Sequence, residues 1–260
     1  MPHQRRLVFA TPLLHWQELT LLHAAPAWSE EYHVAGPRLL LPLSAYFECQ
    51  LGGLMGGLGG VCDATQGLWL TPEEGYRMRQ PIAHQRIMVL AVDAAETSAP
   101  RRFAISLADR LRLHSAAAAV ARGAIDALAV EETLVALLHG CLQIVPHITS
   151  GRTHPAVERA RAWLASDPTR DDSLSDIARA AHCSPFHLMR LFRRHTGRTL
   201  HQQRTQLRLA LALVRLARGE ADLNTLAADL GFSSHSHFSA AFRRATGQTP
   251  GQVRSNLTAH

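Results

Sequence analysis

Two pairs of adjacent arginines, Arg193-Arg194 and Arg243-Arg244, stand at the same place in two similar segments of the C-terminal part. Before the first pair, Phe186, His187 and Arg190 fall on the polar side of an apolar helical pattern. An arginine side chain binds a phosphate, or the edge of a guanine, through two parallel hydrogen bonds. Because the pairs recur, we expect them to contact the phosphates of a nucleic acid rather than to be merely solvated.

The two segments, Leu174–Thr199 and Leu223–Thr249, are copies of one pattern. Matching residues are 49 apart in the first half and 50 apart in the second half, so the turn of the second copy contains one extra residue. The matches pair Leu174, Ala178, Ser184, Phe192, Thr196 and Gly197 with Leu223, Ala227, Ser233, Phe242, Thr246 and Gly247. Such a detailed repeat predicts two structural units of the same kind.

Each copy predicts a short helix, a tight turn and a second helix. In the first copy His182-Cys183 interrupts the helical pattern, and Ser184 is the expected N-cap of the second helix, with Pro185 at its first position. Gly197 is expected to end that helix. In the second copy Gly231 suits a left-handed turn residue, because glycine has no Cβ. A helix-turn-helix with polar groups early in its second helix is the arrangement that enters the major groove of DNA.

A long helix is expected between the copies, within Leu200–Asp222, where an apolar stripe runs up to Gly219. About 19 helical residues span roughly 28 Å. Successive major-groove faces on one side of B-DNA are roughly 34 Å apart. One rigid helix could therefore present two helix-turn-helix units to adjacent major grooves.

Positive charge is concentrated in the same half of the chain. From Arg152 onward, 16 arginines stand against 8 acidic residues, whereas the first 151 residues carry a net charge of −2. Neutralisation of DNA phosphates requires such a distribution. The chain contains no lysine, which favours bidentate arginine contacts but is equally expected of a GC-rich genome.

The region from about Pro155 to Asn256 resembles the DNA-binding domain of the AraC/XylS family of bacterial transcription regulators. The resemblance is carried by LSDIARAA, SPFHLMRLFRR, LAADLGFSSHSHFSAAFRRATGQTP and the long helix between them. It implies that residues early in each second helix face the bases. The expected DNA contacts are Ser184, Phe186, His187, Met189, Arg190, Arg193 and Arg194 in the first unit, and Ser234, His235, Ser236, His237, Ser239, Arg243 and Arg244 in the second.

Two positions depart from the family pattern. Ala240 stands where the first unit has Arg190 and many members carry arginine, so the second unit is expected to read bases more weakly or differently. Val253 replaces a tyrosine that often precedes the final arginine, which is a conservative change in packing. We therefore expect one monomer to read two unlike half-sites, with more specificity from the first unit.

Residues 1–97 are expected to form a small β-barrel or jelly roll. Short apolar runs are separated by Gly, Pro and acidic turns, at Leu7–Ala10, Glu18–Leu22, Arg38–Leu43, Ala45–Gln50, Gly67–Leu70 and Arg86–Val92. Gly52–Gly60 indicates a hairpin turn. The AraC/XylS resemblance implies a cupin-type, effector-sensing domain here, and GLWLTPEEGYRMRQP is similar to a strand-Pro-turn segment of such domains.

Residues 98–146 are expected to provide two helices, the second with an apolar stripe formed by Leu128, Leu134, Leu137, Leu138 and Leu142. These helices either pack on the barrel, form a dimer interface, or do both. Residues 147–154 indicate a polar linker, and residues 155–258 the DNA-binding domain. The predicted fold class is thus α+β, with a cupin-like domain and two helices followed by an all-α domain of two helix-turn-helix units.

No catalytic residue, metal site or cofactor is expected. A catalytic cupin needs a His-x-His and Glu cluster, whereas only isolated His33 and His84 are in range. The histidines near the helix-turn-helix units suit base or phosphate contacts better than a metal. Cys49, Cys62, Cys141 and Cys183 lack metal-like spacing, while a redox-sensing pair of Cys49 and Cys62 remains open.

The sequence predicts a cytoplasmic, one-component transcription regulator. No apolar run approaches the roughly 18 residues needed to span a membrane, and no signal peptide is recognisable. Its expected partners are double-stranded promoter DNA, a small molecule or protein sensed by the N-terminal domain, a second copy of the chain, and RNA polymerase if it activates. Two alternatives are a constitutive regulator whose N-terminal domain only dimerises, and a cupin-like enzyme fused to a DNA-binding domain.

Overall fold

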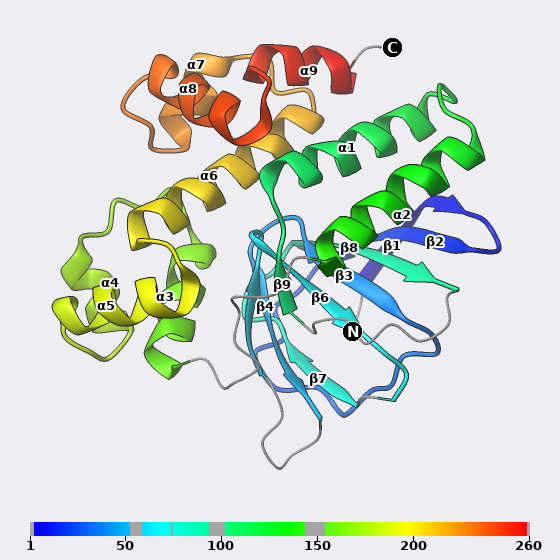
Figure 1. The fold of residues 1–260 in the computed structure, drawn as a ribbon. Helices are drawn as coiled ribbons and strands as arrows, with labels where there is room; N and C mark the ends of the chain where they lie inside the picture. Colours follow the sequence, from blue (N-terminus) through cyan, green and yellow to red (C-terminus); the bar gives the residue numbers. More distant parts are fainter. Residues whose placement is uncertain (1–2, 53–58, 74, 94–101, 144–153, 259–260) are drawn as a thin grey trace.

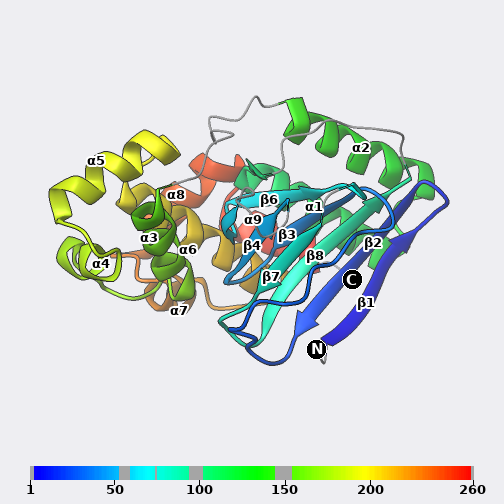
Figure 2. The same cartoon turned by 90° about the horizontal axis from the view of Figure 1, so that it is seen from below.

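The computed structural model describes residues 3–52, 59–73, 75–93, 102–143 and 154–258, which form two antiparallel sheets followed by helices (Figure 1). The strands are β1 His3–Ala10, β2 Leu14–Leu21, β3 Arg38–Pro42, β4 Tyr46–Leu51, β5 Gly59–Asp63, β6 Gln66–Leu70, β7 Tyr76–Arg79, β8 Gln85–Val92 and β9 Arg102–Ala104. The large sheet has the order β1-β2-β8-β3-β6-β9, with β1 at its outer edge (Figure 2). The small sheet has the order β5-β4-β7.

The large sheet is buried on both faces because its strands alternate between two apolar clusters. In β8, Ile87 and Val89 face the small sheet, where they pack with Phe47. Their neighbours Met88 and Leu90 point to the opposite face. Because successive side chains of a strand point to opposite faces, each strand contributes to both apolar clusters.

Two helices cover that opposite face of the large sheet: α1, Leu107–Ala121, and α2, Ala127–Gln143 (Figure 1). Leu113 of α1 and Leu134 of α2 are buried against the sheet residues. Packing on the sheet, one of the two uses expected for these helices, is therefore observed. One detail was wrong: Leu128 is 64% exposed and lies outside the buried stripe.

The observed strands include three that the sequence pattern did not predict, namely β5, β7 and β9. Strand β9 falls within 98–146, the range expected to be helical, and pairs with β6 at the edge of the large sheet. Strands β4 and β5 pair as an antiparallel hairpin on either side of the predicted Gly52–Gly60 turn. Residues 53–58 of that turn, and 147–153 of the predicted linker, lie outside the described residues.

The C-terminal part is helical, with one long helix between two helix-turn-helix units (Figure 1). The helices are α3 Pro155–Ser166, α4 Leu174–Ala180, α5 Pro185–Thr196, α6 Leu200–Ala217, α7 Leu223–Asp229, α8 His235–Thr246 and α9 Pro250–Thr258. The α+β fold class with two successive parts is confirmed. Within the described ranges, no helix is both long and apolar enough to cross a membrane.

The sheets and the C-terminal helices share one apolar cluster. Tyr46 and Val61 of the small sheet, and Leu107 and Leu111 of α1, belong to the same buried group as Ala160 and the other core residues of the C-terminal helices. Helix α1 contacts α6, α8 and α9, and α3 contacts β4 and β5. The N-terminal part therefore packs directly against α8 of the second helix-turn-helix unit, and against α3 and α6, which in turn contact α5 of the first.

Candidate DNA-binding surface

The first unit, α4 and α5, is fixed by local capping interactions. Ser173 and Asp176 form a reciprocal capping box at the start of α4. Ser184 caps α5 by accepting a hydrogen bond from the backbone N–H of His187 at 3.4 Å, and Pro185 is its first residue, as the sequence predicted. Gly197 ends α5 in the left-handed conformation, with φ 69°.

One face of α5 is buried and the other projects outward. Leu188, Leu191 and Phe192 are buried against α3, α4 and α6, as expected from their spacing. On the opposite face Phe186 is 71% exposed and Met189 47% exposed. These two side chains form an apolar area on the outward face of α5.

The polar residues of this α5 face lie beside the apolar ones. Arg190 is exposed, and its Nη2 lies 3.4 Å from Nδ1 of the half-buried His187. The His187 ring also lies 6.1 Å from the ring of His154, the N-cap of α3. These contacts bias the orientation of His187 and leave the remaining Arg190 hydrogen-bond donors available.

The second unit, α7 and α8, repeats this geometry with different outward residues. Ser234, not the predicted match Ser233, caps α8 by accepting from the N–H of His237 at 3.1 Å. The extra residue therefore lies in the turn, as predicted. His235, Ser236 and His237 are exposed, as is Ala240, whose methyl group takes the place of the long Arg190 side chain.

Two polar contacts organise the exposed face of α8. Ser233 Oγ lies 3.1 Å from His237 Nδ1, and the His237 ring packs edge-on against Phe232. The half-buried Ser239 places its Oγ 3.3 Å from Nε2 of His235. This face is therefore a set of short polar side chains, in contrast to the aromatic, thioether and guanidinium groups of α5.

The two arginine pairs lie in the last turns of α5 and α8, and all four side chains are exposed. Within the part of the chain that the structure describes, none of these four arginines forms an ion pair. Unneutralised guanidinium groups at matching places on two units can bind the DNA backbone.

Helix α6 holds the two units apart and also joins them through its arginines. Its 18 residues correspond to about 27 Å. Arg208 donates to the carbonyl oxygens of Pro168 at 2.7 Å and Thr169 at 3.4 Å, in the loop before α4. It also donates to the carbonyl oxygen of Gly231, in the turn before α8, at 2.6 Å. One side chain therefore connects both units, which the sequence analysis missed.

Two observations favour a glycine at position 231. Its φ of 72° is in the left-handed region, as predicted, and a Cβ there would lie 2.8 Å from Arg208 Nη2. The equivalent turn of the first unit instead contains His182, with φ 55°, a conformation that costs a non-glycine residue about 1–2 kcal/mol. The only sequence signal for the α6 contacts was the four-residue spacing of Arg204 and Arg208.

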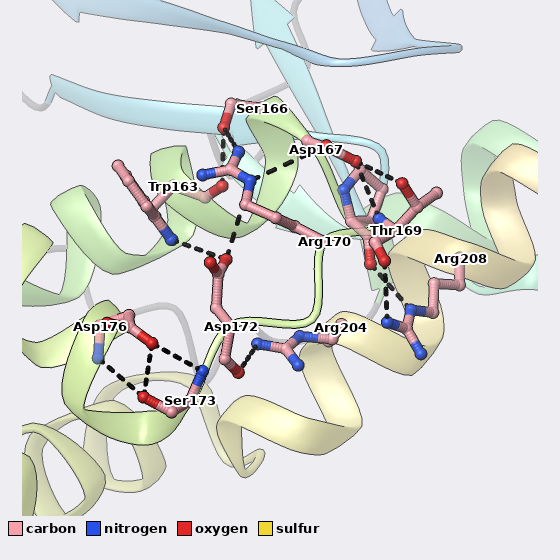
Figure 3. Close-up of polar contacts among 11 residues, drawn as sticks. Trp163, Ser166, Asp167, Thr169, Arg170, Asp172, Ser173, Asp176, Arg204 and Arg208 are labelled. Carbon is pink, nitrogen blue, oxygen red and sulfur yellow. Dashed lines mark hydrogen bonds and ion pairs between the residues drawn. The ribbon is translucent and has the colours of Figure 1, made fainter. Parts of the chain in front are cut away.

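The loop between α3 and α4 is ordered by a polar network (Figure 3). Asp172 accepts a hydrogen bond from Trp163 Nε1 at 2.9 Å, and its carbonyl oxygen accepts from Arg204 at 2.8 Å. The Arg170 guanidinium lies over the Trp163 ring, 4.4 Å from the centroid. Asp167 caps the turn at Thr169. The network presents the Pro168 and Thr169 carbonyl groups to Arg208.

Residues considered for other chemistry are not assembled into a site. In the described ranges, no three His, Cys, Asp or Glu side chains converge as metal ligands. Burial raises the pKa of Cys49 to about 11 and that of Cys62 well above its ordinary value. Because the thiolate is the reactive form, thiols with raised pKa values are poorly suited to sense redox state.

Comparisons with known proteins match the C-terminal helices. Residues 177–256 match the family described as helix-turn-helix domain. The chain is 33% identical over 129 residues to an AraC-like transcription regulator of Streptomyces lividans, covering 48% of this chain and 42% of that protein. It is 34% identical over 96 residues to the regulatory protein SoxS of Escherichia coli K12, covering 37% of this chain and 90% of SoxS.

The match thus spans less than half of the Streptomyces relative but most of SoxS. Among solved structures, ToxT of Vibrio cholerae is 14% identical with a TM-score of 0.39, covering 95% of this chain and 99% of that chain. The C-terminal domain of AraT from Geobacillus stearothermophilus is 28% identical with a TM-score of 0.37, covering 40% of this chain and 87% of that one.

Proposed function

The chain belongs to the AraC/XylS family of transcription regulators, and from that premise we propose that α5 and α8 enter adjacent major grooves of promoter DNA. The observation that carries this proposal is the duplication of one capped, outward-facing helix on the two ends of α6. Each copy exposes its first turns and has two unneutralised arginines in its last turn.

The outward residues suggest different readouts in the two grooves. Arg190 suits two hydrogen bonds to a guanine, and Phe186 and Met189 suit contact with thymine methyl groups. His235, Ser236 and Ser239 suit single hydrogen bonds to base edges. The arginine pairs, with the N-capped ends at Ser184 and Ser234, bind phosphates and fix the register. The remaining proposed contacts are His187, His237, Arg193, Arg194, Arg243 and Arg244.

The N-terminal part controls this binding in the proposed function. Its support is direct packing: α1 contacts α6, α8 and α9, and the small sheet contacts α3. A ligand or partner that shifts the sheets or α1 can thus act on both units. The proposed division of the chain is 1–97 for sensing, 98–146 for packing or dimerisation, 147–154 as linker and 155–258 for DNA binding, with β9 joining the sensing part.

The constitutive alternative rests on α2. Leu128 and Val135 are exposed on this helix and could lie in an interface between two copies of the chain. The protein would then be a dimeric regulator without an effector, acting on promoters in the cytoplasm and contacting RNA polymerase if it activates. Enzymatic activity is not part of either proposal.

The test is selection of DNA by the full-length protein from sheared DNA of its own genome, followed by footprinting. We expect enrichment of sites with two unlike half-sites about one helical turn apart. Substituting glutamine for Arg193, Arg194, Arg243 and Arg244 should lower affinity for all sequences and reduce the salt dependence of binding. The matched control is Arg112→Gln, an exposed arginine on α1. No enrichment by the folded protein would refute the proposal.

A further inference from the structure

His154 lies outside both helix-turn-helix units, at the start of α3. It is the N-cap of that helix, with Pro155 as the first helical residue. Its Nδ1 accepts a hydrogen bond from the backbone N–H of Ala156 at 3.2 Å. Because Nδ1 is the acceptor, the proton of the neutral imidazole is on Nε2. The helix start therefore restrains both the tautomer and the direction of the His154 ring.

The His154 ring packs against α5, which lies beside α3 (Figure 1). Its centroid lies 6.1 Å from that of His187, edge-on at an interplanar angle of 78°, and 6.4 Å from that of His195. Interacting aromatic rings prefer such edge-on arrangements at about 4.5–7 Å. Because His187 and His195 are two turns apart on α5, one ring from α3 supports that length of the helix. His187 is also among the residues proposed to contact DNA.

His187 in turn holds Arg190, the residue proposed to donate two hydrogen bonds to a guanine. Arg190 Nη2 lies 3.4 Å from His187 Nδ1, one helical turn away. An exposed arginine has many rotamers, and restricting them before binding lowers the entropic cost of base recognition. The contacts therefore lead from the start of α3, through His187, to a guanidinium that faces the bases in the proposed complex.

Within the described residues, the second unit has no such support from outside itself. Its His237 ring packs edge-on against Phe232, in its own turn, at 5.6 Å. Ser233 Oγ, in the same turn, lies 3.1 Å from His237 Nδ1. Ala240 stands in the place of Arg190, so there is no guanidinium to orient. The second unit therefore serves as an internal control for any role of His154.

The electrostatics beside His154 favour neutral rings. Burial first, and then the positive charges of Arg194 and His154, lower the pKa of His195, whereas Glu158 acts in the opposite direction. A histidine with a lowered pKa is neutral at pH 7. The contact of His154 with His195 is therefore one between rings, which another aromatic side chain can reproduce.

We propose that His154 is a positioning residue for base recognition by the first unit: its ring orients His187, and His187 orients Arg190 toward one base pair. His154 lies outside the matched residues 177–256, so recognition by the first unit extends into the start of α3. The inference deepens the proposed function and rests on it for the role of Arg190. The contact between His154 and His187 does not depend on DNA.

The contact is tested on the full-length protein without DNA, by the nitrogen chemical shifts of the histidine side chains. His154→Asn removes the ring and keeps an acceptor for the N-cap, because asparagine is a preferred N-cap residue. We expect the imidazole resonances of His187 and His195 to shift, while those of His237 stay in place. Unchanged His187 resonances overturn the proposal.

Base preference is measured on the site selected by the wild type and on its single-base variants. His154→Asn should lower discrimination at the base pair contacted by Arg190 about three- to tenfold, with preferences in the second half-site unchanged. His154→Phe restores a ring without the cap, so base preference should recover while the melting temperature falls by a few degrees. A role in capping alone predicts the reverse: weaker binding to all sequences by His154→Phe, and wild-type binding by His154→Asn.

The coupling to Arg190 is tested by a double variant. Because His154 acts through Arg190, His154→Asn should change base preference no further in an Arg190→Ala background. His84→Asn is the matched control: His84 is exposed with φ 55°, a conformation that asparagine adopts readily, so this variant should bind like the wild type. Additive effects of the two changes, or wild-type discrimination by His154→Asn, overturn the proposal.

Two outcomes distinguish failure of the positioning role from failure of the proposed function. No DNA binding by the folded wild type, or an unchanged base preference in Arg190→Ala, contradicts the proposed function and the positioning role with it. Lost discrimination in Arg190→Ala together with wild-type discrimination in His154→Asn contradicts the positioning role alone.

Discussion

At the scale of single residues, the two units share a scaffold and differ in the side chains that they expose. Phe192 and Phe242 are both fully buried, and Gly197 and Gly247 both end their helices in the left-handed conformation. The outward positions diverge instead, most clearly where Arg190 corresponds to Ala240. Packing in the core constrains the scaffold residues of both units. The exposed residues can differ between the units, because each is proposed to contact a different base sequence.

We predict that Arg190→Ala relaxes specificity at one base pair of the first half-site, at a cost of about 1–3 kcal/mol. The reason is the loss of two hydrogen bonds to a base edge. Measurement is by binding to the selected site and its single-base variants. The reciprocal change Ala240→Arg should introduce a new preference in the second half-site. An unchanged base preference in the Arg190→Ala variant would exclude a direct role of Arg190 in base recognition.

A second prediction at this scale concerns His114, which lies on α1. Burial and then the charge of Arg110 lower its pKa to about 4; Glu18 acts in the opposite direction, and Arg86 lowers it slightly further. In the unfolded chain the pKa is near 6.5. Between these values the unfolded state binds more protons, so the free energy of unfolding must fall as pH decreases from about 6.5 toward 4.

His114→Gln should remove this contribution. The measured quantity is the difference in free energy of unfolding between wild type and His114→Gln at each pH, by urea denaturation, because groups common to both proteins cancel. The difference should change by at most about 1.4 kcal/mol per pH unit within that window and stay constant above it. A difference independent of pH would contradict the burial of a neutral His114.

At the scale of elements, α6 both separates and orients the two units. Arg208 bonds to the loop before α4 and to the turn before α8, and Arg204 bonds to the Asp172 carbonyl (Figure 3). An ion pair, Arg215 with Asp229 at 2.9 Å, also joins α6 to the end of α7. Because these contacts tie the loop before the first unit and the turn of the second unit to one helix, the spacing of the DNA half-sites should be fixed as well.

We predict that Arg208→Gln weakens the preference for one half-site spacing. The shorter side chain cannot reach both loops, so the units lose their common orientation while each keeps its own core. Affinity is measured on operators with one base pair inserted or removed between half-sites. The wild type should lose more affinity than the variant on these operators. Arg179→Gln, an exposed change on α4, is the control; equal spacing preferences in wild type and Arg208→Gln would refute the role.

At the scale of the whole molecule, a buried polar network joins the sheets to the C-terminal helices. Asp63, fully buried at the end of β5, accepts from Arg161 of α3 at 2.6 Å and from Gln203 of α6 at 3.1 Å. The Arg161 side chain is only 6% exposed. Burial tends to raise the pKa of Asp63, but the charge of Arg161 and hydrogen bonds from Thr65 keep it below its ordinary value. The relative position of the two parts depends on this ionised pair.

We predict that Asp63→Asn lowers the free energy of unfolding by about 3–5 kcal/mol, because it leaves the Arg161 charge buried without its partner. Urea denaturation measures this cost. The double variant Asp63→Leu with Arg161→Met should recover much of the stability, since removing both charges also removes the cost of burying them. If the double variant is no more stable than Asp63→Asn, burial of an unpaired charge is not the cause.

The sequence by itself determined the duplicated helix-turn-helix pattern, its caps and its turn glycine. These are local signals: Ser184, Pro185 and Gly197 act on backbone groups within a few residues, so no other part of the chain is needed to interpret them. The residues exposed on α5 also followed from helical spacing, and those on α8 were implied by the family resemblance. The short strands β5, β7 and β9 did not, because their pattern is too brief and their burial depends on neighbouring strands.

Only the tertiary structure decided what joins these elements. Arg161 and Gln203 meet Asp63 from 98 and 140 residues away, and Arg208 bridges loops on both sides of α6 in sequence. Such contacts leave no periodic signal in the sequence, because each arginine finds its partner through the packing of distant segments. The sequence thus determined the DNA-facing units, and the fold decided how the rest of the molecule can act on them.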